Sequence, residues 1–244
     1  MEKMNNNDIK INGSGSSGGG KYNSVIISGS GKINGDLECI DFKTSGSSKV
    51  AGKLKAESIK ISGSAKIEGD VEVGDIKISG SSHIVGNVKS KSIKISGSTH
   101  IEGSLYGEEV SVAGSVNIGK NCETECFKAS GGFKIQGSLN AGQVNVKLGG
   151  KCIVKEIGGE HIEIKINFFD NSLVRKVIDK MFNSRSELTT ELIEGDDIYI
   201  QNTNVKIVRG DNITVGEGCN IGLLEYKGEI NISDASIVKE VKKL

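Results

Sequence analysis

Residues 93–106 read IKISGSTHIEGSLY, and this short stretch decides the fold. Ile93 and Ile95 flank Lys94, and a period of two places alternate side chains on opposite faces of a β-strand. The Gly and Ser residues that follow are turn formers, because glycine adopts positive φ without steric cost. One 17-residue line of the sequence therefore holds three short strands separated by three corners.

The same pattern recurs with a 17-residue period from 26 to 144, in seven lines without a gap. Three columns hold aliphatic or similar apolar residues, and a second glycine column is interrupted only at Lys120. Identical columns must lie above one another at the strand spacing of about 4.8 Å, so the chain winds as stacked coils. The sequence predicts an all-β parallel β-helix, a triangular solenoid with its aliphatic columns inside. The first glycine column consists of Gly29, Gly46, Gly63, Gly80, Gly97, Gly114 and Gly131.

Composition argues against several classes of protein. The 31 basic and 31 acidic residues balance, which disfavours a nucleic-acid binder that works through positive charge. No run of 18 apolar residues exists, so no membrane-spanning helix is expected. Five cysteines at irregular spacing do not form a disulfide framework, and residues 1–24 lack the apolar core of a signal peptide. We therefore expect a cytoplasmic protein.

The repeat divides the chain into four segments. The eighth coil is one residue longer than the others, and we expect it to turn Val146, Ile153 and Ile157 inward. After residue 186, Ile-x-Ile and Ile-x-Val segments recur at a 15-residue and then a 17-residue interval, so the coils are expected to continue. The segments are a flexible Gly-, Ser- and Asn-rich tail with one cap turn at 1–24, the main β-helix at 25–166, an amphipathic helical insert at 167–186, and C-terminal coils with a charged end at 187–244.

The insert is the one part of the chain with helical periodicity. Apolar residues follow one face of a helix, and Asp170, Asn171 or Ser172 offers an N-cap. Such a helix either packs on the solenoid or docks on a membrane surface or a partner protein. Its apolar face consists of Leu173, Val174, Val177, Ile178, Met181 and Phe182.

Residues suited to catalysis or metal binding are sparse, and we predict no catalytic, cofactor-binding or metal site. His83 and His100 share an outward column that elsewhere holds lysine. A basic surface ladder is favoured over a two-histidine metal site, because no carboxylate shares that column. His161 is isolated and is expected to be structural. Cys122 and Cys126 lack the second pair that a zinc site requires, and all cysteines except Cys126 are predicted to be small buried residues.

Three Ile-Ser-Gly-Ser turns at 17-residue spacing resemble the bactofilin family of polymer-forming cytoskeletal proteins: Ile61–Ser64, Ile78–Ser81 and Ile95–Ser98. The resemblance covers residues 25–144. It implies a right-handed β-helix that polymerises end to end without nucleotide and scaffolds cell-envelope or morphogenetic processes. The helical insert and later coils depart from the family's single short β-helix, and its frequent apolar N-terminal anchor has no counterpart in residues 1–24.

One functional hypothesis is a structural scaffold. Both ends of a β-helix leave backbone groups unpaired, which makes them templates for further stacking, and neither proline nor net charge opposes this here. We expect the chain to be its own partner, with Val25, Ile26 and Ile27 as candidate end contacts. A membrane surface, or envelope or morphogenetic proteins, are further candidate partners, with a peripheral place at the inner face of the membrane.

The alternative hypothesis is a β-helical carbohydrate-active or acyl-transfer enzyme, or a solenoid protein for ligand binding or adhesion. Such a protein needs a cleft where carboxylates, histidines or aromatic side chains converge. The sequence shows no such convergence, so the scaffold is favoured and no cofactor is expected.

Overall fold

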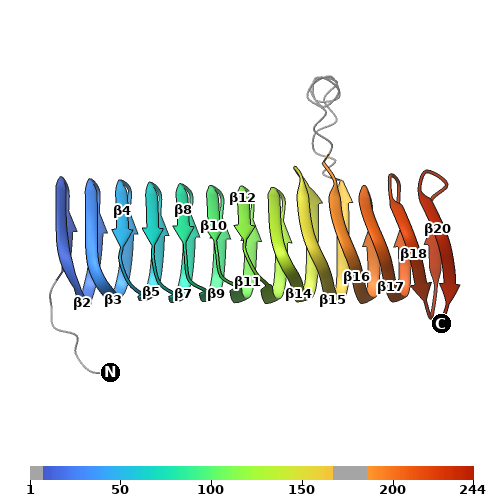
Figure 1. Ribbon diagram of the computed structural model, residues 1–244, viewed down its shortest axis with the longest axis horizontal. Helices are drawn as coiled ribbons and strands as arrows, with labels where there is room; N and C mark the ends of the chain where they lie inside the picture. Colours follow the sequence, from blue (N-terminus) through green and yellow to red (C-terminus); the bar gives the residue numbers. More distant parts are fainter. Residues whose placement is uncertain (1–7, 167–185) are drawn as a thin grey trace, which may run out of the picture. The chain divides into compact units, whose positions relative to one another are not determined.

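The computed structural model describes residues 8–166 and 186–244 (Figure 1). The chain forms two compact units, of which unit 1 ends at Lys120 and unit 2 begins at Asn121. All elements in the described residues are β-strands, and each unit is a stack of parallel coils, which confirms the predicted β-solenoid. In this part of the chain we find no helix with the length and apolar character needed to cross a bilayer.

Unit 1 is built from strands of eight and four residues that alternate along most of its coils. Partners in neighbouring coils follow the 17-residue period, so Leu54 pairs with Leu37 in the preceding coil and with Val71 in the next. The strands are β1 (Ile9–Ile11), β2 (Ser14–Ile27), β3 (Ser30–Thr44), β4 (Ser47–Val50), β5 (Leu54–Ile61), β6 (Ser64–Ile67), β7 (Val71–Ile78), β8 (Ser81–Ile84), β9 (Val88–Ile95), β10 (Ser98–Ile101), β11 (Leu105–Val112) and β12 (Ser115–Ile118).

The predicted apolar columns form the core of these coils. In β7, Ile76 is buried while its neighbour Lys77 is exposed, and the same alternation recurs in β5 and β9. Alternation is interrupted once within each long strand, for example at Glu57 and Ser58, neither of which is buried. This interruption is the third corner of the coil. Each buried aliphatic side chain contributes roughly 1.5–3 kcal/mol, so one coil is stabilised mainly by the column members that it adds.

The first glycine column is explained by the close approach of successive coils. A Cβ atom at Gly80 would lie 1.9 Å from the carbonyl oxygen of Gly63, and one at Gly63 would lie 2.1 Å from that of Gly46. Among the described glycines, positive φ occurs only at Gly20, Gly35 and Gly218, none of which belongs to this column. The expectation that these turns use positive φ is therefore wrong: the column needs glycine because no side chain fits between the coils.

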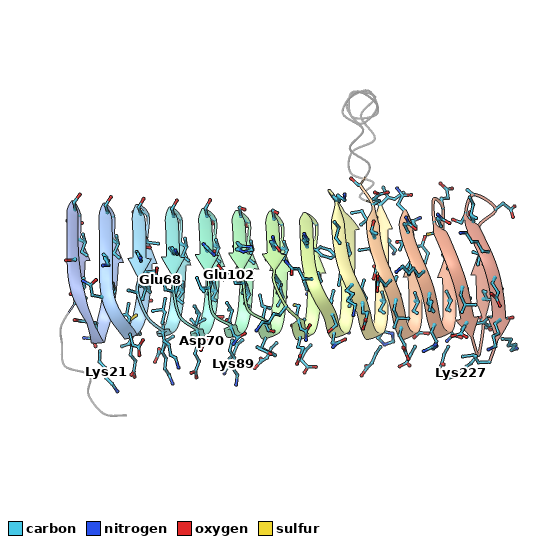
Figure 2. All side chains as sticks on the ribbon, in the orientation of Figure 1. Lys21, Glu68, Asp70, Lys89, Glu102 and Lys227 are labelled. Carbon is cyan, nitrogen blue, oxygen red and sulfur yellow. The ribbon has the colours of Figure 1, made fainter. Side chains whose placement is uncertain are left out.

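The second glycine corner is tied together by side-chain oxygens. Asp70 Oδ1 accepts a hydrogen bond from the backbone N–H of Asn87 at 2.8 Å, and Asn87 Oδ1 accepts one from Ser104 N–H at 2.9 Å. Asp36 makes the same contact with the N–H of Lys53 at 2.8 Å. Figure 2 places Asp70 at this corner, along one edge of unit 1. Each coil thus satisfies a backbone donor of the next.

Strand β1 and most of β2 lie in residues 1–24, for which the sequence predicted a flexible tail with one cap turn. β2 pairs with β3 through its glycine-rich half, where Gly15 faces Gly31 and Gly18 faces Asn34. Because backbone N–H and C=O groups make these bonds, the glycines complete a coil without apolar side chains.

Unit 2 has longer strands and less regular coils. Val144 pairs with Ile162, one position beyond the 17-residue period, as the predicted one-residue extension requires. Cys152 and Val154 are buried and Ile153 is half-buried, so the predicted inward place of Ile153 is wrong. At this strand Ile135 pairs with Val154, a register one residue longer than the predicted extension, and a shift of one residue reverses which members of a strand face the core. The strands are β13 (Cys122–Ala129), β14 (Gly132–Leu148), β15 (Cys152–Ile166), β16 (Leu188–Ile200), β17 (Thr203–Val215), β18 (Asn220–Tyr226), β19 (Ile230–Ile232) and β20 (Ile237–Lys243).

The later coils follow the predicted intervals. Ile198 pairs with Ile213 at the 15-residue interval, and Ile213 pairs with Ile230 at the 17-residue interval. The register passes directly from Ile162 to Ile198, so two paired strands flank the predicted insert. The predicted helix itself, with all six residues of its apolar face, lies outside the described residues.

Candidate functional site

The last strand of unit 2 leaves an apolar column uncovered. Ile193, Val208, Leu224 and Val241 are successive register partners, and the first three are fully buried. Val241, in β20, is 48% exposed because β18 covers it on one side only. Figure 1 shows β20 at the end of its unit. Among the described residues, three of the five exposed large hydrophobic residues lie in or directly after β20: Ile237, Val241 and Leu244.

Charged residues lie beside this apolar edge. The Glu225 side chain is only 10% exposed, and its Oε2 accepts hydrogen bonds from Arg209, with Nη2 at 2.8 Å and Nε at 2.9 Å. Lys242 Nζ in β20 lies 3.8 Å from the other oxygen of Glu225. The hydrogen bond to Glu225 is also the main reason why the pKa of Arg209 is raised. The Lys242–Glu225 ion pair joins β20 to β18, while the apolar side chains of β20 stay exposed.

At the start of unit 1, β1 covers the candidate end contacts. Val25 and Ile27 are fully buried and pair with Ile9 and Ile11 of β1, while Ile26 is half-buried. Ile9 and Ile11 are themselves half-buried. Among the described residues, the outer apolar residues at this end are therefore those of β1, one coil further out than the predicted end contacts. The segment Ile9–Ile11 repeats the Ile-Lys-Ile pattern of residues 93–95, which is a signal for a further coil.

The cysteines are unpaired, and Cys39, Cys122, Cys152 and Cys219 are buried as predicted. Burial raises the pKa of Cys122 to about 12, and burial followed by nearby carboxylates raises that of Cys39 to about 12. These thiols stay protonated at neutral pH and act as apolar core residues.

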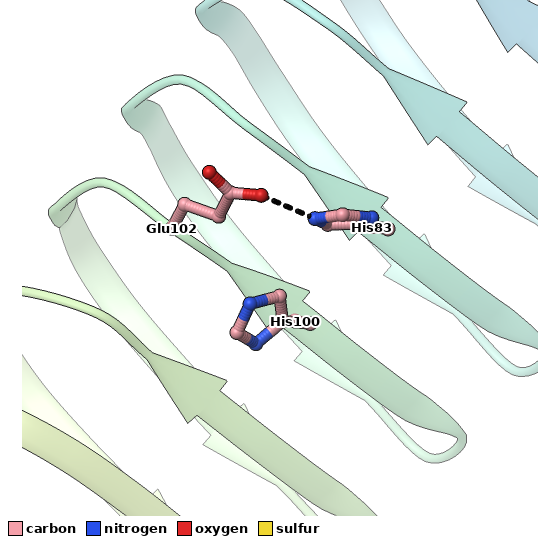
Figure 3. Close-up of side chains that lie close together, drawn as sticks. All are labelled: His83, His100 and Glu102. Carbon is pink, nitrogen blue, oxygen red and sulfur yellow. Dashed lines mark hydrogen bonds and ion pairs between the residues drawn. The ribbon is translucent and has the colours of Figure 1, made fainter.

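Two histidines and a glutamate meet on the outer face of unit 1 (Figure 3). His83 in β8 and His100 in β10 are direct register partners, and their ring centroids lie 5.1 Å apart. Glu102 follows β10, and its Oε1 atom lies 2.8 Å from His83 Nε2. No carboxylate lies within the histidine column itself, and Glu102 reaches the column from two positions further along. His161 makes a separate exposed pair, with Nδ1 3.1 Å from Asp197 Oδ2.

Comparison with known proteins places the chain in a family. A family model described as Bactofilin, polymer-forming cytoskeletal, matches residues 3–89. The uncharacterized protein YhbE of Bacillus subtilis (strain 168) is 56% identical over 237 residues, which cover 97% of this chain and 98% of that protein. The chain belongs to the bactofilin family.

A second relative of this bactofilin covers less of it. The uncharacterized protein YhbF of the same organism is 34% identical over 93 residues, or 37% of this chain and 34% of that protein. No solved structure matches this bactofilin. The region matched by the family model includes β1 to β8, where the 17-residue register begins. The Ile-Ser-Gly-Ser turns thus identified the family correctly from the sequence.

Proposed function

We propose that this bactofilin is a non-enzymatic scaffold that assembles by itself, through the stacking of coil ends and without nucleotide. Its membership of a polymer-forming cytoskeletal family and its parallel coils support the proposal. In this proposal the polymer organises cell-envelope or morphogenetic processes from the cytoplasmic side.

The observation that carries the proposal is the uncovered column at β20. In a solenoid each coil is stabilised by the coils on both sides, so a terminal coil lacks one neighbour. Val241 extends a fully buried column and remains about half exposed, and Val238, the register partner of the fully buried Ile221, is half-buried. A strand added to the free edge of β20 would cover these side chains and pair the edge backbone.

The occupant that fits this edge is a second copy of the same chain. Its β1 presents Ile9 and Ile11, which are half-buried and continue inward columns through Val25 and Ile27. If β1 of one copy pairs with the free edge of β20 of another, the parallel stacking seen within each unit continues from copy to copy. Contacts between like ends, β20 on β20 and β1 on β1, are the other arrangement and would give a filament without polarity.

A single end-to-end contact between two copies is expected to be weak. Complete burial of an aliphatic side chain contributes roughly 1.5–3 kcal/mol, while association loses an estimated 4–15 kcal/mol of translational and rotational freedom. Three exposed apolar residues at the β20 end are therefore not enough alone, and the backbone bonds of a seven-residue strand must contribute. Assembly should consequently depend on protein concentration.

The proposal is tested with the purified full chain by light scattering and negative-stain microscopy across protein concentration and salt, without nucleotide. Val241→Lys and Val238→Lys should abolish or strongly reduce assembly, because both residues continue buried columns of β18. Ile40→Lys is the matched control, because Ile40 is 38% exposed in β3, a strand that pairs with β2, β4 and β5, and the charge change is the same. Circular dichroism should show that all three variants keep their β-structure.

Two outcomes would overturn the proposal. One is a wild-type chain that keeps the monomer mass of 25.8 kDa under every condition. The other is assembly that Ile40→Lys weakens as much as Val241→Lys does, which would indicate contacts through the sides of the coils.

A further inference from the structure

The His83, His100 and Glu102 cluster has the geometry of a partial coordination sphere. The candidate ligand atoms, one from each residue, all lie within 4.8 Å of one another. Two ligands of one tetrahedral ion, each bound at about 2.0–2.2 Å, are about 3.4 Å apart. The limit of 4.8 Å leaves room for this separation, and His83 Nε2 and Glu102 Oε1 already lie 2.8 Å apart.

The backbone holds the two histidines in place while their side chains can adjust. His83 and His100 are on paired strands, each in the middle of a four-residue ladder. The side chains of His83 and Glu102 are 40% and 47% exposed, so they can reach a bound ion by small rotations. Solvent can supply the remaining ligands at this half-exposed position.

An equivalent cluster two coils away, made of two lysines and a glutamate, shows ordinary charge pairing and serves as a comparison. Lys66 is the register partner of His83, and Glu68 occupies the position of Glu102 (Figure 2). Glu68 Oε1 lies 2.8 Å from Lys49 Nζ and 3.7 Å from Lys66 Nζ. The hydrogen bond from Lys49 is the main reason why the pKa of Glu68 is lowered. There the glutamate neutralises two ammonium groups that have no lone pair to offer a metal.

At His83, His100 and Glu102, imidazole rings take the place of the two lysine ammonium groups. Each ring has a lone pair in its neutral form. The two imidazoles and the carboxylate of Glu102 together form a ligand set. Two imidazoles and a carboxylate suit Zn²⁺ and its neighbours Co²⁺, Ni²⁺ and Cu²⁺.

We propose that His83, His100 and Glu102 bind one divalent transition-metal ion of the zinc type, which bridges two successive coils on the outer face of unit 1. The site is independent of end-to-end assembly, because all three residues lie on the flank of the coils. An ion held by both coils binds the folded chain better than the unfolded one and so stabilises this part of the solenoid.

The test uses the full-length, metal-free protein in a Cys126→Ser background, because Cys126 is the partly exposed thiol. Co²⁺ is titrated by its visible absorption and Zn²⁺ by calorimetry. We expect one saturable site per chain and a thermal transition that rises with Zn²⁺ concentration. Two substitutions already occur in this fold at equivalent positions: His83→Lys matches Lys66, and His100→Asn matches Asn117, its partner in the next coil.

Both variants, and Glu102→Gln, should bind at least about 10-fold more weakly, since removal of outer-shell partners alone lowers metal affinity by 10–100-fold. Glu68→Gln is the matched control for Glu102→Gln, and His161→Asn is the control for loss of a surface histidine. Neither control should change the affinity. The proposal is overturned if the parent protein shows no saturable binding, or if its affinity is unchanged in His83→Lys and His100→Asn.

Discussion

A single added methyl group at Gly80 should separate two coils. The Cβ atom of Gly80→Ala would lie 1.9 Å from Gly63 O, whereas ordinary contact begins at 3.4 Å. The coils must therefore move apart at this corner by most of the difference between these two distances. Gly80 has no positive φ, so the effect of the substitution comes from the contact and not from backbone strain.

Three backbone hydrogen bonds cross this corner and would be stretched together. Ser79 and Gly80 donate to Ile61 O at 2.8 and 3.3 Å, and Ser81 donates to Gly63 O at 2.9 Å. At a net value of about 1 kcal/mol each, their loss should cost about 3 kcal/mol. For a chain of this size, that corresponds to a thermal midpoint lower by about 6–12 °C.

Thermal unfolding followed by circular dichroism at low protein concentration measures this loss. Gly18→Ala is the matched control, because an added Cβ at Gly18 meets nothing within 4 Å and Gly18 has no positive φ. That variant should be neutral or slightly more stable, since alanine restricts the unfolded chain. If the two variants shift the midpoint equally, steric exclusion does not explain the glycine column.

Two further predictions concern the core. Ile84→Asp should destabilise the chain by several kcal/mol, because Ile84 is 2% exposed and the new charge has no partner; the exposed Lys94→Asp should stay within about 0.5 kcal/mol, and equal losses in urea unfolding would contradict the assignment of faces. Of the five thiols, Cys126 alone should react quickly with iodoacetamide at pH 8, since burial raises the pKa of Cys122 to about 12 and that of Cys152 to about 11. Stability from these buried thiols is fully present below their ordinary pKa of 9.0 and is lost as the pH rises through 11 and 12. Unfolding curves at pH 8 and pH 11 should show this loss of stability. Rapid labelling of Cys122 in the folded protein would contradict the burial of its thiol.

The coil, and its inward faces over the seven 17-residue lines, follow from the sequence alone. Each coil places the same residue types at the same corners, so the 17-residue interval is visible as glycine and aliphatic columns. The sequence also predicted the later 15-residue and 17-residue intervals, because Ile-x-Ile and Ile-x-Val segments mark successive coils. In a solenoid each coil pairs only with its neighbours along the chain, so a repeat in the sequence can predict which residues pair.

The contacts between groups of neighbouring coils are known from the three-dimensional structure and not from the pattern. The pattern did not show that Gly80 is needed for its contact with Gly63 O, because that clearance depends on the separation of two backbones. Neither did it show that Glu102 turns back to His83, since a corner directs its side chain to the preceding coil. The cover of Val25 and Ile27 by β1 likewise depends on backbone pairing by a glycine-rich segment. Such contacts are set by three-dimensional distance and direction, which the spacing of residue types does not record.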